Sequence, residues 1–186
     1  MLLSDVKILS EMKKGNIVIE PFVLESLGAN SYDVKLGENF YFPNPNFRKA
    51  FDVFDQHAVS EFFMYEHHNN RENVTLPPNA TALCHTVETI GGRNAITCIL
   101  RCRSSVMRCG LSIAKCAGVG DVGYVNRWTM ALSNHNTVPV TIKVGMRIGH
   151  ILFFRVGRTL KEYRGKYYKG QPWSPEQMLP RLWEDL

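Results

Sequence analysis

The chain has 186 residues, a formal net charge of +5 and a hydrophobic fraction of 45%. This length favours one domain that can bury a substantial core. No apolar run approaches the roughly 20 residues that a membrane-spanning helix needs. Residues 1–5 turn polar at once, which gives no sign of a signal peptide. We therefore expect a cytoplasmic protein with no membrane partner, located in the host cytoplasm if the chain is viral.

The positive charge is spread along the chain rather than gathered in one block. No run of five or more Lys and Arg occurs, so the sequence predicts no nucleic-acid partner. The excess of positive charge suits a small anionic ligand such as a nucleotide. The five cysteines are odd in number and lack C-x-x-C spacing, which argues against a disulfide framework or a zinc site. We expect no metal bound by protein side chains alone.

Short alternating segments separated by turn residues dominate the pattern. Ser4 and Asp5 precede an amphipathic run that predicts a capped helix ending at Gly15. The predicted strands are 17–19, 31–36, 82–87, 95–103, 111–116, 128–134, 139–143 and 148–154, with strand–turn–strand over 40–54, a polar loop over 56–73 and a turn at 91–92. Many short strands at this spacing predict a mainly-β sandwich, jelly roll or barrel.

Residues 157–186 differ from the rest in composition. The stretch 161–171 is basic and aromatic and contains two glycines, so it suits neither a helix nor a separate domain. We expect residues 1–156 to form the β domain and 157–186 to form a C-terminal arm of that domain. An arm of this composition suits phosphates and flat rings, although a tail without such a role remains an alternative.

Residues 117–134 contain the strongest local signal. Three glycines surround Asp121, Tyr124 follows, and an alternating strand comes next. Glycines before a strand mark a tight hairpin at which a ligand or another segment approaches the backbone. Asp121 is either a turn residue or a catalytic group.

A second signal follows the predicted strand 95–103. Two arginines, Arg103 and Arg108, flank the adjacent hydroxyls of Ser104 and Ser105. Arginine offers forked donors to phosphate oxygens, and serine adds a donor without bulk. The segment is either a phosphate cradle or a strand-end turn. The acid Asp33, on the polar side of the strand 31–36, is expected to pair with a neighbouring basic side chain.

Five segments resemble, in the same order, the motifs of the dCTP deaminase branch of the dUTPase superfamily. R-S-S-V-M-R-C-G-L at 103–111 is similar to its R-S-S-x-x-R-x-G-L motif. The other matching segments are 3–21, 29–37, 144–149 and 165–171. The resemblance covers nearly the whole chain except the insert at 45–75, whose role the sequence leaves open. It implies a distorted jelly roll with a short N-terminal helix and a C-terminal arm. It also implies a homotrimer with interfacial sites that binds a deoxynucleoside triphosphate with Mg²⁺.

The superfamily has two chemistries, and Ala131 decides between them in our interpretation. The resemblance places the deaminase glutamate ten residues after the hairpin aspartate, at 121 + 10 = 131, where this chain has alanine. The segment 118–134 is instead similar to the dUTPase motif. We therefore expect a dUTP diphosphatase. The alternatives are a dCTP deaminase, perhaps bifunctional in also hydrolysing dUTP, and a non-catalytic nucleotide-binding module.

The resemblance also assigns roles to individual residues. Asp121 would activate the water that attacks the α-phosphorus, and the Tyr124 ring would pack on the deoxyribose. The substrate-binding residues would be Arg103, Ser104, Ser105, Arg108, Tyr124, Thr129, Met130, Ala131, Tyr163, Lys166 and Gln171. The sequence does not reveal which base is preferred or which arm residues contact phosphate.

Overall fold

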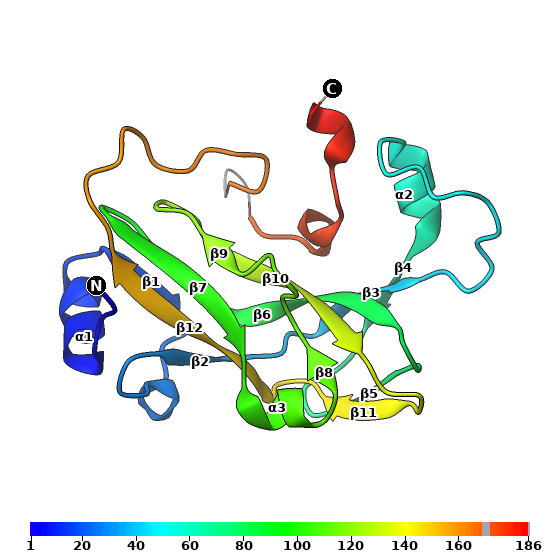
Figure 1. Ribbon diagram of the computed structural model, residues 1–186, viewed down its shortest axis with the longest axis horizontal. Helices are drawn as coiled ribbons and strands as arrows, with labels where there is room; N and C mark the ends of the chain where they lie inside the picture. Colours follow the sequence, from blue (N-terminus) through cyan, green and yellow to red (C-terminus); the bar gives the residue numbers. More distant parts are fainter. Residues whose placement is uncertain (169–171, 186) are drawn as a thin grey trace.

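The computed structural model describes residues 1–168 and 172–185 and consists mainly of antiparallel strands (Figure 1). The largest sheet has the order β4-β3-β6-β10-β8, with β1 pairing β6. A second sheet has the order β2-β12-β7-β9, and β11 pairs β5 in a third. The bounds are β1 Ile17–Glu20, β2 Tyr32–Lys35, β3 Asn39–Pro43, β4 Phe63–His67, β5 Asn73–Leu76, β6 Thr81–Gly92, β7 Ile96–Cys102, β8 Leu111–Ser112, β9 Val119–Gly120, β10 Val125–Asn134, β11 Val140–Lys143 and β12 Arg147–Arg155.

Three short α-helices accompany the sheets in the described residues: α1 (Asp5–Lys13), α2 (Gln56–Phe62) and α3 (Ser104–Arg108). Three 3₁₀ helices are η1 (Leu24–Ser26), η2 (Pro175–Met178) and η3 (Leu182–Asp185). None of the helices in the described part of the chain has the length and apolarity needed to cross a membrane. The expected N-terminal helix is confirmed. Its cap differs from the expectation, because the Ser4 side chain makes no capping hydrogen bond and Asp5 Oδ1 accepts one from the Val6 N–H at 2.7 Å.

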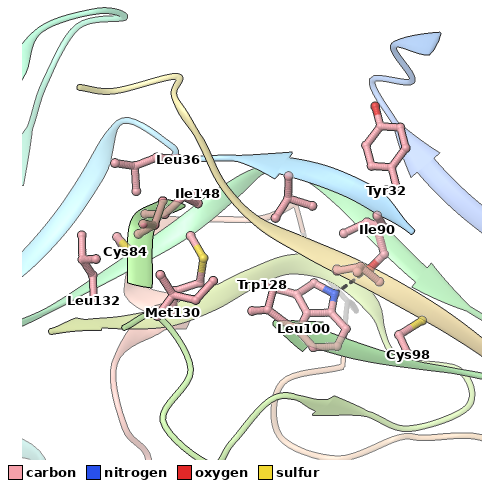
Figure 2. Packing of buried hydrophobic residues seen from close by; sticks show 14 of the residues in the cluster. Tyr32, Leu36, Cys84, Ile90, Cys98, Leu100, Trp128, Met130, Leu132 and Ile148 are labelled. Atoms are coloured by element: carbon pink, nitrogen blue, oxygen red, sulfur yellow. Dashed lines mark hydrogen bonds between the residues drawn. The ribbon is translucent and has the colours of Figure 1, made fainter. Parts of the chain in front are cut away.

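The alternation of buried and exposed residues places the core between the sheets. Trp128, Met130 and Leu132 of β10 point to the same side and are buried, as Figure 2 shows. The Trp128 indole N–H donates to the Ile90 carbonyl at 2.8 Å, so its polar atom is satisfied inside the core (Figure 2). Burying a side chain of this kind contributes about 1.5–3 kcal/mol. The opposite face of β10, which carries Thr129 and Ala131, is therefore free to form a site.

The glycines at 91–92 do not form the expected turn. They lie inside β6, where Gly91 pairs with Val125 of β10 and with Val18 of β1. A Cβ atom on Gly91 would lie 2.0 Å from the Tyr124 carbonyl oxygen. The glycine therefore serves the close approach of two strands, and the chain reverses after it, at residues 93–95.

Other boundaries also differ from the pattern-based expectation. Residues 44–54 form no second strand, and α2 and β4 occupy part of the predicted loop 56–73. Asp55 caps α2 by accepting a hydrogen bond from the His57 N–H at 2.8 Å. The segment 104–108 is helical, and the strand predicted over 111–116 is confined to β8. The expected pairing of Asp33 is confirmed, with Arg147 at 3.3 Å and Arg103 at 3.6 Å.

A buried carboxylate fastens α1 to the sheets. The Glu11 side chain is 5% exposed, accepts hydrogen bonds from Asn16 at 2.6 Å and Lys14 at 2.9 Å, and pairs with Arg155 at 2.8 Å. Chiefly because Asn16 and Lys14 donate to the ionised form, the pKa of Glu11 falls from 4.5 to about 2.

Replacing Glu11 by Gln is expected to lower the free energy of unfolding at pH 7 by about 1–3 kcal/mol. A depressed folded-state pKa stabilises the fold above the unfolded value of 4.5, and this contribution is lost as the pH falls toward about 2. The stability difference between wild type and variant should therefore shrink across this window in urea titrations. A difference that stays constant from pH 7 to pH 2 would contradict this role of Glu11.

Candidate functional site

The expected β-hairpin at 117–134 is instead a tight turn, because β9 pairs with β7 in one sheet and β10 pairs with β6 in another. This turn between β9 and β10, here called the hairpin, is held rigidly. The Tyr124 N–H donates to the Asp121 carbonyl at 2.9 Å, closing a turn at whose third position Gly123 has φ +96°. The Gly123 N–H donates to the Gly92 carbonyl at 2.8 Å. Thr97 Oγ1 donates to the Gly120 carbonyl at 2.7 Å. These bonds hold the backbone of the turn in place, with the exposed Asp121 side chain at its tip.

A cavity of about 420 Å³, here called the hairpin cavity, opens beside this tip. Its lining comes from the hairpin, β10, β6, β4 and the C-terminal arm. The described lining residues are Phe63, Leu83, Ala117, Val119, Gly120, Asp121, Tyr124, Trp128, Thr129, Tyr163, Tyr167, Met178 and Pro180. Asp121 is the sole carboxylate among them, and none of them is a lysine or arginine.

Tyr124 forms part of an aromatic wall of this cavity. Its ring lies edge-on to Trp128 at 5.3 Å and to Tyr163 at 5.4 Å between centroids. Burial raises the pKa of Tyr124, so the phenol stays neutral near neutral pH. The contact between Tyr124 and the arm residue Tyr163, which the sequence did not predict, therefore provides an apolar aromatic surface next to Asp121, which suits a sugar or a base.

The strand β10 has an open edge at the site. It pairs with β6 along one side, whereas β8 covers the other side only at Ser133 and Asn134 in the described structure. The Asn134 N–H donates to the Ala80 carbonyl at 2.9 Å. Asn134 and every second residue before it in β10 therefore direct their backbone N–H and C=O groups toward β6. The N–H and C=O groups of Thr129 and Ala131 therefore point to the open edge and can pair with the polar edge of a heterocycle.

The three strand residues of the predicted site have different positions. Thr129 is exposed and lines the hairpin cavity. Ala131 is half-buried and lies opposite Leu83, itself a lining residue. Met130 is fully buried in the core, with its side chain on the face away from Thr129 and Ala131 (Figure 2). Thr129 and Ala131 thus lie on the face of β10 that borders the site, and Met130 packs in the core on the opposite face.

A second cavity of about 510 Å³, here called the arginine cavity, contains two of the four predicted cradle residues, Arg103 and Ser104. Arg101, Arg103, Lys115, His150 and Ser104 line it, and no carboxylate is among its described lining residues. Burial, as the main cause, lowers the pKa of His150, so this ring carries little charge near neutral pH.

The two cavities lie on either side of one segment. Val119 lines both, whereas Ala117 and Asp121 line the hairpin cavity but not the arginine cavity. Ser105 and Arg108 lie exposed on α3 and are not among the described residues that line either cavity. Sequence reasoning did not identify Lys115, whose backbone has φ +45° in a coil segment. Such a conformation is uncommon for residues other than glycine and often accompanies functional loops.

The arm covers the hairpin of its own chain. The Tyr163 N–H donates to the Val122 carbonyl at 2.8 Å, which holds Tyr163 beside the hairpin, and its expected role in substrate binding stays a prediction. Lys166 instead pairs with Asp185 at 2.7 Å and donates to the Arg181 carbonyl at 3.0 Å. Gln171 lies outside the described residues.

Two other arm cations line a cavity that Asp121 also lines. They are Lys161 and Arg164, and the cavity has a volume of about 560 Å³. The basic and aromatic composition of the arm predicts cations in this segment, but it does not predict which of them line a cavity with Asp121.

The last part of the arm is fixed by contacts far apart in the sequence. Asn126 Nδ2 donates to the Tyr167 carbonyl at 3.3 Å and to Gln177 Oε1 at 3.4 Å. The Trp173 ring lies 4.3 Å from the ring of the buried His85, and the Arg127 guanidinium lies 4.8 Å from the Trp173 centroid. Burial lowers the pKa of His85 to about 4, so Trp173 packs on a neutral imidazole.

The described side chains provide no preformed metal site. Within residues 1–168 and 172–185, no group of three or more His, Cys, Asp or Glu is placed to hold a metal ion. A lone carboxylate such as Asp121 fits a Mg²⁺ ion only when substrate phosphates supply further oxygens, as Mg²⁺ sites commonly do.

Comparison with known proteins gives a consistent result. A family model described as dCTP deaminase-like matches residues 2–156. A Methanosphaerula palustris protein named "dCTP deaminase, dUMP-forming" is 29% identical over 174 residues, covering 92% of this chain and 91% of that protein. A Methanopyrus kandleri protein of the same name is 32% identical and covers 95% of both chains. Another, from Nanoarchaeum equitans, is 30% identical and covers 100% of both.

A solved structure supports the fold. The crystal structure of the 2′-deoxycytidine 5′-triphosphate deaminase from Agrobacterium tumefaciens matches with a TM-score of 0.63 at 17% identity. The match covers 84% of this chain and 46% of that one, so this chain spans less than half of the larger protein. The expected jelly-roll fold of the dUTPase type is confirmed.

The comparisons overturn the expected dUTP diphosphatase. The full-length relatives are named dCTP deaminases that form dUMP, so the dUTPase interpretation was wrong. That interpretation relied on the single residue Ala131 rather than on the five deaminase-like segments along the chain. Forming dUMP from dCTP also removes diphosphate, so the phosphate chemistry inferred from Asp121 and Tyr124 does not distinguish the two activities.

Proposed function

Because this chain belongs to the dCTP deaminase-like family, we propose that it is a dCTP deaminase. The observation that supports this most strongly is the full-length similarity to proteins named "dCTP deaminase, dUMP-forming". The hairpin cavity agrees with the proposal, because it joins an aromatic wall, an open strand edge and a single carboxylate. The polar edge of cytosine would pair with the Thr129 and Ala131 backbone, and the deoxyribose would lie against Tyr124.

The reaction needs one proton carrier near the ring. A water oxygen adds to carbon 4 of cytosine while one water proton goes to N3 of the ring. The second water proton is transferred to the exocyclic amino group, the bond from carbon 4 to that nitrogen breaks, and ammonia leaves with uracil as the product. Asp121 is the sole carboxylate among the described residues of the hairpin cavity, so we assign proton transfer to it. Position 131 offers no second carboxylate, and slow deamination is expected from this arrangement.

The triphosphate requires cations that the hairpin cavity does not contain. Arg103, Ser104 and Lys115 lie in the separate arginine cavity. We propose that a second copy of the chain brings its arginine cavity to the hairpin cavity of the first, in a homotrimer. Light scattering would contradict this assembly if it gave the single-chain mass of 21.2 kDa.

Mg²⁺ would arrive with the triphosphate. When bound, it would be held by the triphosphate oxygens and would neutralise phosphate charge, because Asp121, the sole carboxylate among the described residues of the hairpin cavity, is assigned to proton transfer. The residues of the chain itself hold the nucleotide, orient its ring and move the proton.

The proposal is tested by offering dCTP and dUTP separately and identifying the products by chromatography. We expect dCTP to be converted to a uracil nucleotide with release of ammonia. Consumption of dUTP with dCTP left intact would contradict the proposal. Tight binding of dCTP without any product would also contradict it, and would support the non-catalytic module that Ala131 suggests.

A further inference from the structure

The insert at 45–75, to which the proposed function assigns no role, helps to form a further cavity. It includes the β3–β4 excursion, the strand β4 and the loop 68–72 before β5. This loop, the turn 143–146 from β11 to β12, and Lys35 and Glu38 at the end of β2 line a cavity of about 750 Å³, here called the basic cavity. It shares no described lining residue with the hairpin cavity or the arginine cavity. Cavities of this size commonly hold small ligands.

Backbone hydrogen bonds hold the three segments of this cavity together. The Leu36 N–H donates to the Met146 carbonyl at 2.9 Å, and the Gly145 N–H donates to the Leu36 carbonyl at 2.8 Å. The Arg71 N–H donates to the Val144 carbonyl at 3.1 Å. The fold itself therefore positions the walls of the basic cavity, although the segments lie far apart in the sequence.

Each of the three segments contributes one cation to the lining: Lys35, Arg71 and Lys143. In the described part of the chain, none of the three side chains forms an ion pair within 4.0 Å. Arg71 also has φ +66°, a conformation that is uncommon for residues other than glycine and that often accompanies functional sites. The three positive charges are therefore available to an anionic ligand.

Few carboxylates oppose these charges inside the cavity. Glu38 is the sole acid among the described lining residues, and it pairs with Arg127 at 3.4 Å, outside the lining. Three further acids bond to lining residues without belonging to the described lining themselves: Glu66, Glu72 and Glu88. Their hydrogen bonds go to the loop 68–72 and to the Lys35 backbone N–H. The lining thus carries three cations against one acid that is already paired.

Three cations around one cavity match a ligand with several adjacent negative charges. Arginine offers forked donors to phosphate oxygens, and lysine binds phosphate as a point charge. The Asn70 amide, also in the lining, can add a neutral donor. We propose that the basic cavity binds a polyphosphate group, either free or on a nucleotide, at a site separate from the candidate active site. This inference goes beyond the proposed function and does not depend on it.

Isothermal titration with inorganic pyrophosphate in a buffer without Mg²⁺ tests this site. Arg103→Ala is the starting protein, because it removes a cation of the arginine cavity, where pyrophosphate could also bind. Adding Arg71→Gly and Lys143→Ala should then weaken the remaining binding by about 10-fold or more, because two charge-assisted contacts are lost. Glycine is chosen at position 71 because it adopts φ +66° without strain.

The matched control adds Lys7→Ala and Lys13→Ala to the same starting protein. Both lysines lie exposed on α1 and are not among the described residues that line these cavities, so their loss removes two positive charges and should leave the affinity unchanged. Titration with ATP distinguishes the two sources of the group: tighter binding than pyrophosphate assigns the site to a nucleotide, and weaker binding assigns it to free polyphosphate.

Two results would overturn the inference and leave the proposed function standing. One is a starting protein that binds neither pyrophosphate nor ATP. The other is an affinity that Arg71→Gly with Lys143→Ala changes no more than the control pair does, since binding would then follow net charge or lie elsewhere.

Discussion

Replacing Ala131 by glutamate is expected to raise the rate of ammonia release from dCTP by about 10²- to 10⁴-fold. A positioned proton carrier typically contributes a factor of this size. Ala131 is half-buried on the site face of β10, opposite the cavity residue Leu83, and its neighbour Thr129 borders the cavity directly. A longer side chain at 131 would therefore extend toward the hairpin cavity and add a second carboxylate near the ring.

Ala131→Gln is the matched control for this gain. Glutamine has nearly the size of glutamate but cannot take up a proton from water, so it should leave the rate near the wild-type value. Ammonia release should be followed at saturating dCTP, so that changes in affinity do not enter. Equal rates in the two variants would show that position 131 does not face the reacting ring.

Replacing Asp121 by asparagine is expected to lower ammonia release from dCTP by about 10²- to 10⁴-fold while leaving nucleotide binding largely intact. Asparagine keeps the size of the side chain, and the hairpin bonds of Tyr124, Gly123 and Gly120 involve backbone groups of the turn and the Thr97 hydroxyl. The loss should therefore reflect the missing carboxylate. Turnover and the affinity for dCTP should be measured on the same preparation.

Asp52→Asn provides the control for Asp121→Asn. Asp52 is an exposed acid of the β3–β4 excursion that accepts a hydrogen bond from the Phe54 N–H at 2.9 Å, and it borders neither cavity in the described lining. Its replacement should leave turnover unchanged. Undiminished turnover in Asp121→Asn, measured beside this control, would remove Asp121 from the mechanism.

The sequence predicts much of the fold because its signals are local. Alternation in segments such as 148–154 marks a strand with one buried face, and Gly15 marks the end of α1. The errors arise where tertiary contacts decide. Gly91 signals a turn by composition, yet the close approach of Tyr124 makes it a strand residue. The helix α2 is short, and its last residue, Phe62, stacks on Phe51, a contact that the local pattern of the sequence does not show.

The candidate site is predictable to the extent that its chemistry lies in one segment. Asp121 and Tyr124 lie together in the hairpin, and Arg103 with Ser104 lies in the cradle. The sequence could not predict that Phe63 joins Asp121 at one cavity, because 58 residues (121 − 63 = 58) separate them in the chain. The sequence also did not predict that Lys166 pairs with Asp185, because folding of the arm brings these two residues together.

The preferred chemistry was the hardest property to obtain from the residues. Ala131 is a single departure, and by itself it favours phosphate chemistry over deamination. Similarity along 92–100% of the chain to proteins named dCTP deaminases points the other way. The two observations agree only if proton transfer in this chain depends on Asp121. The Ala131→Glu variant tests this by adding a second carboxylate, and the Asp121→Asn variant tests it by removing the first.

Ammonia released from dCTP by the wild-type protein is the most direct measurement, with the Asp121→Asn variant as the blank. The proposed function predicts ammonia in proportion to the dCTP consumed, with a uracil nucleotide as the product and with the signal falling to the background level in the variant. Wild-type protein that binds dCTP but releases no more ammonia than Asp121→Asn would contradict the assignment of this chain as a dCTP deaminase.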